Sequence, residues 1–280
     1  MNYNFNLSLI ENYKSNSQKI RVMSETWLAE NVYCPYCGNS HLSKFANNKP
    51  VADFYCDSCG EVFELKAKEN NIGKKITDGA YSTMIERITS ISNPDLFVMQ
   101  YTKEYQVLNL LVVPKFFFTP EIIEKRKPLS ENARRAGWIG CNILISDIPK
   151  QGKIFIVDRQ HLRNKEDVIN DYKLIKNMQT NNINNRGWLF DVLNCINEIP
   201  DKEFKLNDVY RFIEVLKEKH INNNHIEAKI RQQLQLLRDK GYIEFLERGH
   251  YRKIKRTTLL KEFIYGKEDP PDSWNILFLI

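Results

Sequence analysis

Apolar residues recur at helical spacing over the first thirty residues of the chain, which predicts helical structure over 1–30. A second helix is predicted over 78–90, DGAYSTMIERITS, and the Asn93-Pro94 pair ends it. The periodic positions of the first segment are Leu7, Ile10, Tyr13, Ile20, Met23 and Trp27.

Shorter runs between and after these helices have the patterns of strands. The first two alternate between apolar and polar residues, as half-buried strands do. The next two are almost wholly apolar and are separated by a short polar segment, which predicts neighbouring buried strands. The runs are VADFY (51–55), EVFELKA (61–67), 96–101, 105–113 and 153–157. This mixture of helices and strands places the N-terminal part in the α/β class.

A different pattern begins after KNMQTNNINNR (176–186), which is rich in asparagine and poor in apolar residues. We interpret this segment as a linker and expect one domain over 1–180. Three amphipathic segments and a hairpin turning at Arg248-Gly249 follow, which is the element order of a winged helix over 185–253. Residues 254–280 form a C-terminal extension to which the sequence assigns no role. The residues expected to face the winged-helix core are Ile230, Leu234, Leu237 and Ile243.

Composition narrows the class of protein. Hydrophobic residues make up 42% and aromatic residues 11%, which is enough for a packed core. The net charge of +6 permits a polyanionic partner and fits a merely basic protein equally well. No apolar run reaches the length of a membrane span, and the polar N-terminal segment does not resemble a signal peptide. We therefore expect a cytoplasmic protein with no membrane partner, in a compartment where disulfides are rare. We also expect the protein to be a monomer.

Four of the six cysteines form two CxxC pairs, Cys34/Cys37 and Cys56/Cys59, each followed by glycine. This spacing is typical of a structural Zn²⁺ site with four thiolate ligands, closed to substrate. The alternative is four free buried cysteines, and a redox centre is disfavoured because redox motifs contain a single CxxC. The two single cysteines, at 141 and 195, are expected in the core.

The second CxxC pair lies between the two alternating strands, and acidic residues flank it. Asp53 is expected on the first strand, while Glu64 and Lys66 share one face of the second. Two carboxylates on adjacent strands suit Mg²⁺, and a lysine beside them can orient a water molecule and stabilise phosphate charge. Charged residues also alternate on solvated strand faces, but these two carboxylates stand among apolar neighbours.

A basic segment without periodicity, RKPLSENARRAGWIGC, occupies residues 126–141. We expect a long ordered loop there, and such loops are often functional. Arginines bind phosphates and guanine edges, whereas Trp138 either presents its face to a base or anchors the loop in the core. The basic residues of the loop are Arg126, Lys127, Arg134 and Arg135.

The third predicted helix of the C-terminal segment starts at His225 and has a polar side suited to reading base edges in the major groove. The hairpin after it offers cations to phosphates, although some winged helices bind protein instead. The candidate DNA contacts are Asn223, His225, Lys229, Arg231, Gln232 and Gln233 on or before the helix, and Arg248 and Arg252 on the hairpin.

Several segments carry a family resemblance: ENYKSNSQK, NNKPVADFYC, EVFELKAK, DGAYSTM, RRAGWIGCN, RGW at 186–188 and IRQQLQLLRDK. They occur in collinear order from residue 1 to about 253. On these segments the chain resembles the DpnI-like methyl-directed restriction endonucleases, which are PD-(D/E)xK nucleases. Two features depart from the family: Pro50 stands three residues before Asp53 instead of beside it, and 254–280 has no counterpart.

The resemblance implies a PD-(D/E)xK core with an inserted zinc knuckle, and a type II enzyme that cleaves double-stranded DNA at GATC containing N6-methyladenine. Asp53, Glu64 and Lys66 fall on the family's catalytic triplet, and the four paired cysteines fall on its zinc ligands. Trp138 then becomes the candidate for contact with the methyl group, with Arg134 and Arg135 nearby.

We accordingly expect a metal-dependent phosphodiesterase in which Mg²⁺ binds Asp53, Glu64 and the backbone carbonyl of Leu65. A non-catalytic winged-helix regulator with a zinc site is the alternative, since it would need the cysteines and the basic helix but not the triplet. A nuclease of this fold with another site or modification is a weaker option.

Overall fold

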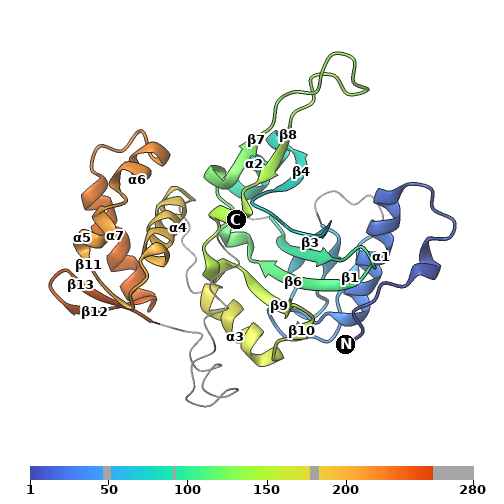
Figure 1. Cartoon of the computed structure of the whole chain (residues 1–280), viewed down its shortest axis with the longest axis horizontal. Helices are drawn as coiled ribbons and strands as arrows, with labels where there is room; N and C mark the ends of the chain where they lie inside the picture. The colour runs from blue at the N-terminus through green and yellow to red at the C-terminus, as the bar shows by residue number, and fades with distance from the viewer. Residues whose placement is uncertain (47–51, 91–92, 177–182, 255–280) are drawn as a thin grey trace.

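The computed structural model describes residues 1–46, 52–90, 93–176 and 183–254 of the chain. Its largest sheet has seven strands in the order β1-β2-β3-β5-β6-β9-β10 (Figure 1). Neighbours are antiparallel except β3 and β5, which run parallel. The strands are β1 (Ser43–Lys44), β2 (Phe54–Tyr55), β3 (Val62–Glu69), β5 (Asp95–Tyr101), β6 (Val107–Val113), β9 (Ile154–Asp158) and β10 (His161–Leu162).

One side of β3 is an open sheet edge over most of its length. β2 pairs with β3 only at Val62 and Phe63, whereas β5 pairs with it from Phe63 to Glu69. Among the described residues, the part of β3 from Glu64 onward therefore has a sheet partner on the β5 side alone. Strand β5 is central and buried on both faces, which explains its almost continuous apolar sequence.

Helices and a second sheet complete the N-terminal part. The second sheet has the order β4-β8-β7, and α2 follows β4 directly. Between β7 and β8 the chain makes a long loop that projects from the body (Figure 1). The elements are η1 (Leu7–Ile10), α1 (Asn16–Asn31), β4 (Ile76–Ala80), α2 (Tyr81–Thr89), η2 (Lys115–Phe117), η3 (Pro120–Ile122), β7 (Ile123–Lys125), β8 (Gly140–Ile143), η4 (Ile145–Asp147), η5 (Lys150–Gly152) and α3 (Lys165–Lys176).

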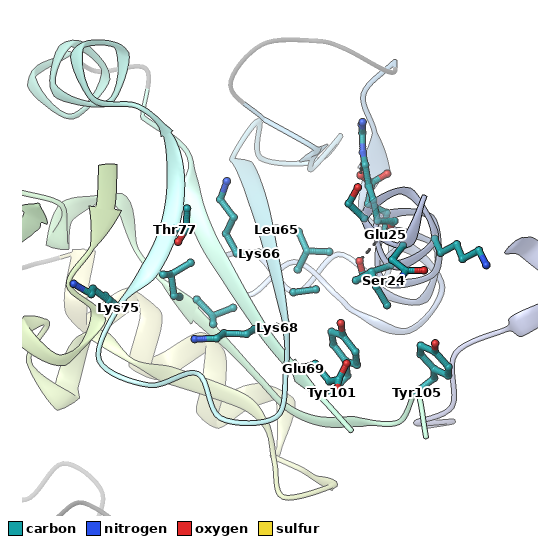
Figure 2. Close-up of a pocket in the computed structure, with 18 residues that line it drawn as sticks. Ser24, Glu25, Leu65, Lys66, Lys68, Glu69, Lys75, Thr77, Tyr101 and Tyr105 are labelled. Carbon is teal, nitrogen blue, oxygen red and sulfur yellow. Dashed lines mark hydrogen bonds and ion pairs between the residues drawn. The ribbon is translucent and has the colours of Figure 1, made fainter. Parts of the chain in front are cut away.

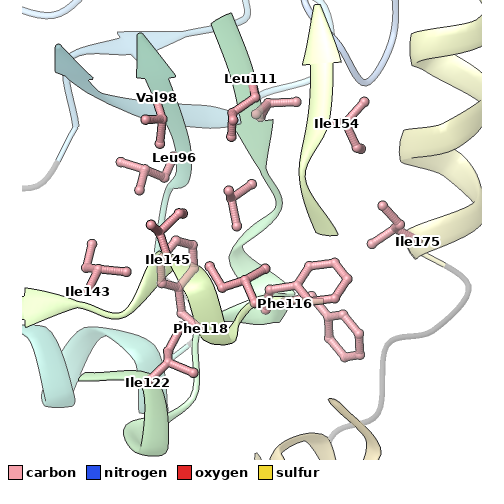
Figure 3. Close-up of a cluster of buried hydrophobic side chains, with 14 of the residues drawn as sticks. Leu96, Val98, Leu111, Phe116, Phe118, Ile122, Ile143, Ile145, Ile154 and Ile175 are labelled. Carbon is pink, nitrogen blue, oxygen red and sulfur yellow. The ribbon is translucent and has the colours of Figure 1, made fainter. Parts of the chain in front are cut away.

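A buried apolar cluster joins these layers (Figure 3). Side chains of β5, β6 and β9 meet side chains from β8, from α3 and from the segment between β6 and β7. Removing this much apolar surface from water is the main favourable term in folding. The labelled members are Leu96, Val98, Leu111, Phe116, Phe118, Ile122, Ile143, Ile145, Ile154 and Ile175.

The C-terminal part consists of helices followed by a small sheet of order β11-β13-β12. Phe190 of its first helix contacts the N-terminal part, with its ring centroid 5.1 Å from that of Phe116 and 4.6 Å from that of Phe117. The side-chain amides of Gln151 and Asn197 exchange two hydrogen bonds of 3.0 Å across the same boundary. The elements are α4 (Ile183–Glu198), β11 (Glu203–Lys205), α5 (Leu206–Tyr210), α6 (Ile213–Lys219), α7 (Ile226–Asp239), β12 (Ile243–Glu247) and β13 (His250–Lys253).

The predicted elements are present, with corrections at their boundaries. The helix predicted over 1–30 is a short 3-10 turn followed by α1. The helix predicted from residue 78 starts at Tyr81, because Ile76 to Ala80 pair with β8 instead. Pairing of this kind overrides local helical preference.

The winged-helix segment shows the predicted order with two additions. The second helix is divided into α5 and α6, and the short strand β11 was not predicted. The hairpin turns at Arg248-Gly249 as predicted, where Gly249 has φ +72°. The four residues predicted to face the core are all buried. The linker prediction falls partly on 177–182, outside the described residues, and α4 already begins at Ile183. No helix in the described ranges is long and apolar enough to cross a membrane.

Candidate active site and metal centres

The four paired cysteines gather at one point beside β2 and β3. Their sulfur atoms all lie within 4.8 Å of one another, with Cys34 Sγ 3.7 Å from Cys59 Sγ and Cys37 Sγ 3.5 Å from Cys56 Sγ. Tetrahedral Zn²⁺ with bonds of about 2.3 Å separates its sulfur ligands by about 3.8 Å. The sulfur arrangement therefore fits zinc, and four protein ligands leave no position for a substrate.

Both CxxC turns have the same backbone geometry. Gly38 donates to the carbonyl of Cys34 at 2.8 Å, and Gly60 donates to the carbonyl of Cys56 at 2.9 Å. The two glycines have φ of +79° and +74°, which is a conformation that favours glycine. The sequence thus encodes two matched turns that aim their thiols at a common centre. The single cysteines at 141 and 195 are buried in the core, as predicted.

Asp53 lies immediately before β2 and not on the strand where it was predicted. Its backbone N–H donates to the carbonyl of Phe63 at 2.9 Å, which fixes it beside β3. Its Oδ2 accepts a 2.7 Å hydrogen bond from the N–H of Leu65. The side chain thus caps the open edge of β3 where β2 has stopped pairing.

The N–H and C=O groups of any one residue in a strand point to the same side. Because the N–H of Leu65 points to Asp53 at the open edge, its carbonyl oxygen points to that edge as well. A carboxylate oxygen and a backbone carbonyl oxygen are ligands of the kind that Mg²⁺ prefers. The predicted ligand role of Leu65 is therefore compatible with the strand geometry.

Lys66 is held by two carboxylates, one of which the sequence interpretation missed. Its Nζ lies 2.7 Å from Glu64 Oε1, as their shared strand face predicts, and 2.5 Å from Asp78 Oδ1 on β4. Arg87 of α2 approaches the other oxygen of Glu64, with Nη2 3.4 Å from Oε2. The acidic residue Asp78 gave no signal in the sequence because it lay in a predicted helix.

Burial and charge shift the pKa values of these groups. Burial raises the pKa of Glu64, against the attraction of Lys66, and burial also raises the pKa of Asp53. Burial lowers the pKa of Lys66, but the carboxylates of Glu64 and Asp78 outweigh this effect and leave the pKa above its ordinary value. The two half-buried carboxyls are thus incompletely solvated, and a bound cation would stabilise their ionised forms.

A groove of about 600 Å³ beside this cluster is lined by residues of α1, β3 and the start of β4 (Figure 2). Leu65 on β3 faces Glu25 on α1 across the groove, and Lys66 lies at its margin. Glu25 is buried and pairs with Arg21 at 2.6 Å and with Lys44 at 3.1 Å. Sequence reasoning missed Glu25, although its spacing of four residues from Arg21 indicates a helical ion pair.

Two protein-family models match the chain, one over each of its two parts. Residues 1–181 match the model of the Dam-replacing family, DpnI, and residues 184–253 match the model of the Dam-replacing HTH domain. The chain belongs to the DpnI family. Membership places it among methylation-dependent DNA nucleases with a C-terminal helix-turn-helix domain, and both predicted parts of the resemblance are confirmed.

The basic loop predicted at 126–141 is an ordered hairpin extension between β7 and β8. Arg126 N donates to the carbonyl of Gly140 at 3.0 Å, and Leu129 N donates to the carbonyl of Trp138 at 2.9 Å. Arg134 and Arg135 are exposed, as DNA-binding residues must be. Trp138 is half-buried, so it neither points freely into solvent nor anchors the loop in the core.

The residues of the HTH domain that were predicted to read DNA differ in their exposure to solvent. His225, Arg231, Gln232 and Arg248 are exposed, and Asn223 and Lys229 are half-buried. Gln233 was predicted on the polar side of α7 but is fully buried, so that assignment is wrong. Arg252 is engaged in ion pairs with Glu203 at 2.9 Å and Glu244 at 3.1 Å across the small sheet.

Proposed function

We propose that the protein is a type II methyl-directed restriction endonuclease that hydrolyses double-stranded DNA at GATC containing N6-methyladenine. One observation carries this proposal: a half-buried carboxylate, Asp53, is hydrogen-bonded to the strand that presents Glu64 and Lys66, in a chain of the DpnI family. A regulator that only binds DNA has no need of two half-buried carboxyls beside a lysine, since withdrawing such groups from water costs free energy.

Asp53, Glu64 and the carbonyl of Leu65 are the residues that would hold a divalent cation, for which we propose Mg²⁺. Bound there, the cation would supply a Lewis acid that neutralises phosphate charge and lowers the pKa of a water molecule. Lys66 contributes its ammonium group, which orients the attacking water and stabilises the negative charge that develops on the phosphate. Asp78 keeps this ammonium group in place through its 2.5 Å contact.

Zinc has a structural role in this proposal. Cys56 follows β2 and Cys59 precedes β3, so the zinc-bound turn closes the hairpin that carries Asp53 on one side and Glu64 on the other. A closed four-thiolate site stabilises such a hairpin without taking part in the reaction. The zinc ligands therefore fix the distance between the two halves of the catalytic triplet.

Two surfaces are proposed to bind the methylated duplex. The loop between β7 and β8 would contact the methyl group through Trp138, and the HTH domain would read bases from α7. A methyl adds a small apolar surface in the major groove, worth about 1 kcal/mol in a fitted pocket. Two reading domains multiply this discrimination. The proposed contacts are Arg126, Arg134, Arg135, Trp138, Asn223, His225, Lys229, Arg231, Gln232, Arg248 and Arg252.

The test uses one plasmid prepared with and without adenine methylation at GATC, incubated with the protein and Mg²⁺. Discrete fragments from the methylated plasmid alone are expected. Cleavage of both would retain the nuclease and reject methyl dependence. The variant Asp53→Ala should bind methylated DNA and leave it intact, whereas absence of cleavage by the zinc-loaded, Mg²⁺-supplied wild type would favour a binding protein.

A further inference from the structure

The indole ring of Trp138 lies against the backbone of its own hairpin, two residues further along the chain. Gly140 is the first residue of β8 and is buried. A Cβ atom built on Gly140 would lie 2.8 Å from both Cζ3 and Cη2 of Trp138, and 3.4 Å from Nη1 of Arg126. Side chains essentially never approach a Cβ within 3.0 Å, so any residue other than glycine would displace the benzo end of the ring.

Hydrogen bonds on both sides hold the backbone of Trp138. Its N–H donates to the carbonyl of Arg135 at 3.1 Å, and its carbonyl accepts from Leu129 at 2.9 Å. The N–H of Gly137 also donates to Leu129, at 3.0 Å, from a backbone with φ +76°. A side chain added at position 140 would therefore rotate the Trp138 side chain about its torsion angles and would not move the hairpin backbone.

A second contact restrains the ring from its own loop. The guanidinium carbon of Arg135 lies over the indole, 4.7 Å from the ring centroid. A cation over an indole is attracted by the negative charge at the ring face. With Gly140 against the benzo end and Arg135 over the ring, the free protein already holds Trp138 in a defined orientation.

The position of this ring is also defined relative to the catalytic lysine. Strand β8 pairs with β4, where Ala80 is opposite Gly140 and Asp78 is opposite Cys141. Asp78 is the residue that contacts Lys66 at 2.5 Å. The strand that begins at Gly140 is thus hydrogen-bonded to β4, whose Asp78 holds the ammonium group of Lys66.

We propose that Gly140 determines methyl specificity, because the absence of a side chain there sets the position of the Trp138 indole that contacts the N6-methyl group. This inference rests on the proposed function and deepens it. Dispersion contacts weaken steeply with distance, so a displaced ring loses its contact with the methyl. A ring moved by one added methyl group no longer fits the methyl that it reads.

The variant Gly140→Ala tests the proposal. The measurement is kcat/KM on duplexes that differ only in adenine methylation, and the expected result is a fall of about fourfold or more in the methylated-to-unmethylated ratio, as for the loss of one methyl contact. Gly79→Ala is the matched control on the neighbouring strand β4, because a Cβ built there meets nothing within 4 Å. Its ratio should equal that of the wild type, and a wild-type ratio in Gly140→Ala overturns the proposal.

A double-mutant cycle shows whether Gly140 acts through the indole. Phenylalanine at position 138 lacks the benzo end, so Gly140→Ala should change the ratio less than twofold in the Trp138→Phe background. An equal fall in both backgrounds overturns the proposal.

Two other results, a folding failure of the variant and a wild type without methyl dependence, have their own interpretation. If Gly140→Ala alone does not fold, folding of the double variant supports the steric contact with Trp138, and failure of the double variant to fold overturns it. A wild type that cuts both duplexes equally retains the nuclease but rejects the methyl dependence of the proposed function, and this inference with it.

Discussion

The buried carboxyl of Asp95 makes the free energy of unfolding depend on pH, and the size of this dependence can be predicted. Asp95 is fully buried at the start of β5, where it is opposite Phe63 of β3. It accepts hydrogen bonds from the hydroxyl of Tyr172 on α3 and from the N–H of Lys115 at 2.6 Å. Burial raises the pKa of Asp95 from 3.8 to about 6, although both hydrogen bonds lower it.

The sign of the effect follows from proton linkage. Between about pH 4 and 6 the folded state binds this proton more tightly than the unfolded state, so the contribution of Asp95 to the free energy of unfolding falls as the pH rises. At about 1.4 kcal/mol per pKa unit, the whole fall is about 3 kcal/mol. Roughly half of it, about 1.4 kcal/mol, lies between pH 5 and 8.

The substitution Asp95→Asn removes the titrating group and keeps the size of the side chain. Urea unfolding of the zinc-loaded wild type and variant at several pH values, followed by circular dichroism, gives the difference between their free energies of unfolding. We expect the wild type to lose about 1.4 kcal/mol relative to the variant from pH 5 to pH 8. Asp201→Asn, at an exposed aspartate, is the control. A difference that stays constant across this range would refute the reasoning.

Three other predictions address the metal sites and the DNA surface. Cys37→Ala should reduce bound zinc, measured by atomic absorption, from about one ion per chain to near zero and abolish cleavage, whereas Cys195→Ala in the core should retain the ion. Asp78→Asn should lower kcat by about ten- to a hundredfold with DNA affinity within about twofold, because Lys66 loses one charged partner; equal losses in affinity would contradict this. Arg248→Ala should reduce the salt dependence of DNA binding by about one phosphate contact, measured by titration at several salt concentrations, and an unchanged slope would remove this residue from the interface.

The sequence alone determined those features whose signals are local. Two CxxC pairs with a glycine after each predict a zinc site, since neighbouring thiolates in a tight turn reach one ion in almost any fold. The spacing of Glu64 and Lys66 predicts a shared strand face, because side chains alternate with a period of two, and the two groups are in contact at 2.7 Å. The order of helices and hairpin after residue 186 likewise predicted the fold of the C-terminal part.

Features that depend on contacts between distant segments required the tertiary structure. Asp78 reaches Lys66 only because residues 76–80 pair with β8 as a strand, although 78–80 were predicted to begin a helix. Gln233 occupies a polar position of α7 in sequence but is buried by packing. Gly140 shows its steric relation to Trp138 only once the hairpin has closed. A periodic pattern records which face of an element is buried, whereas the identity of the packing partner is decided by topology, which no local pattern records.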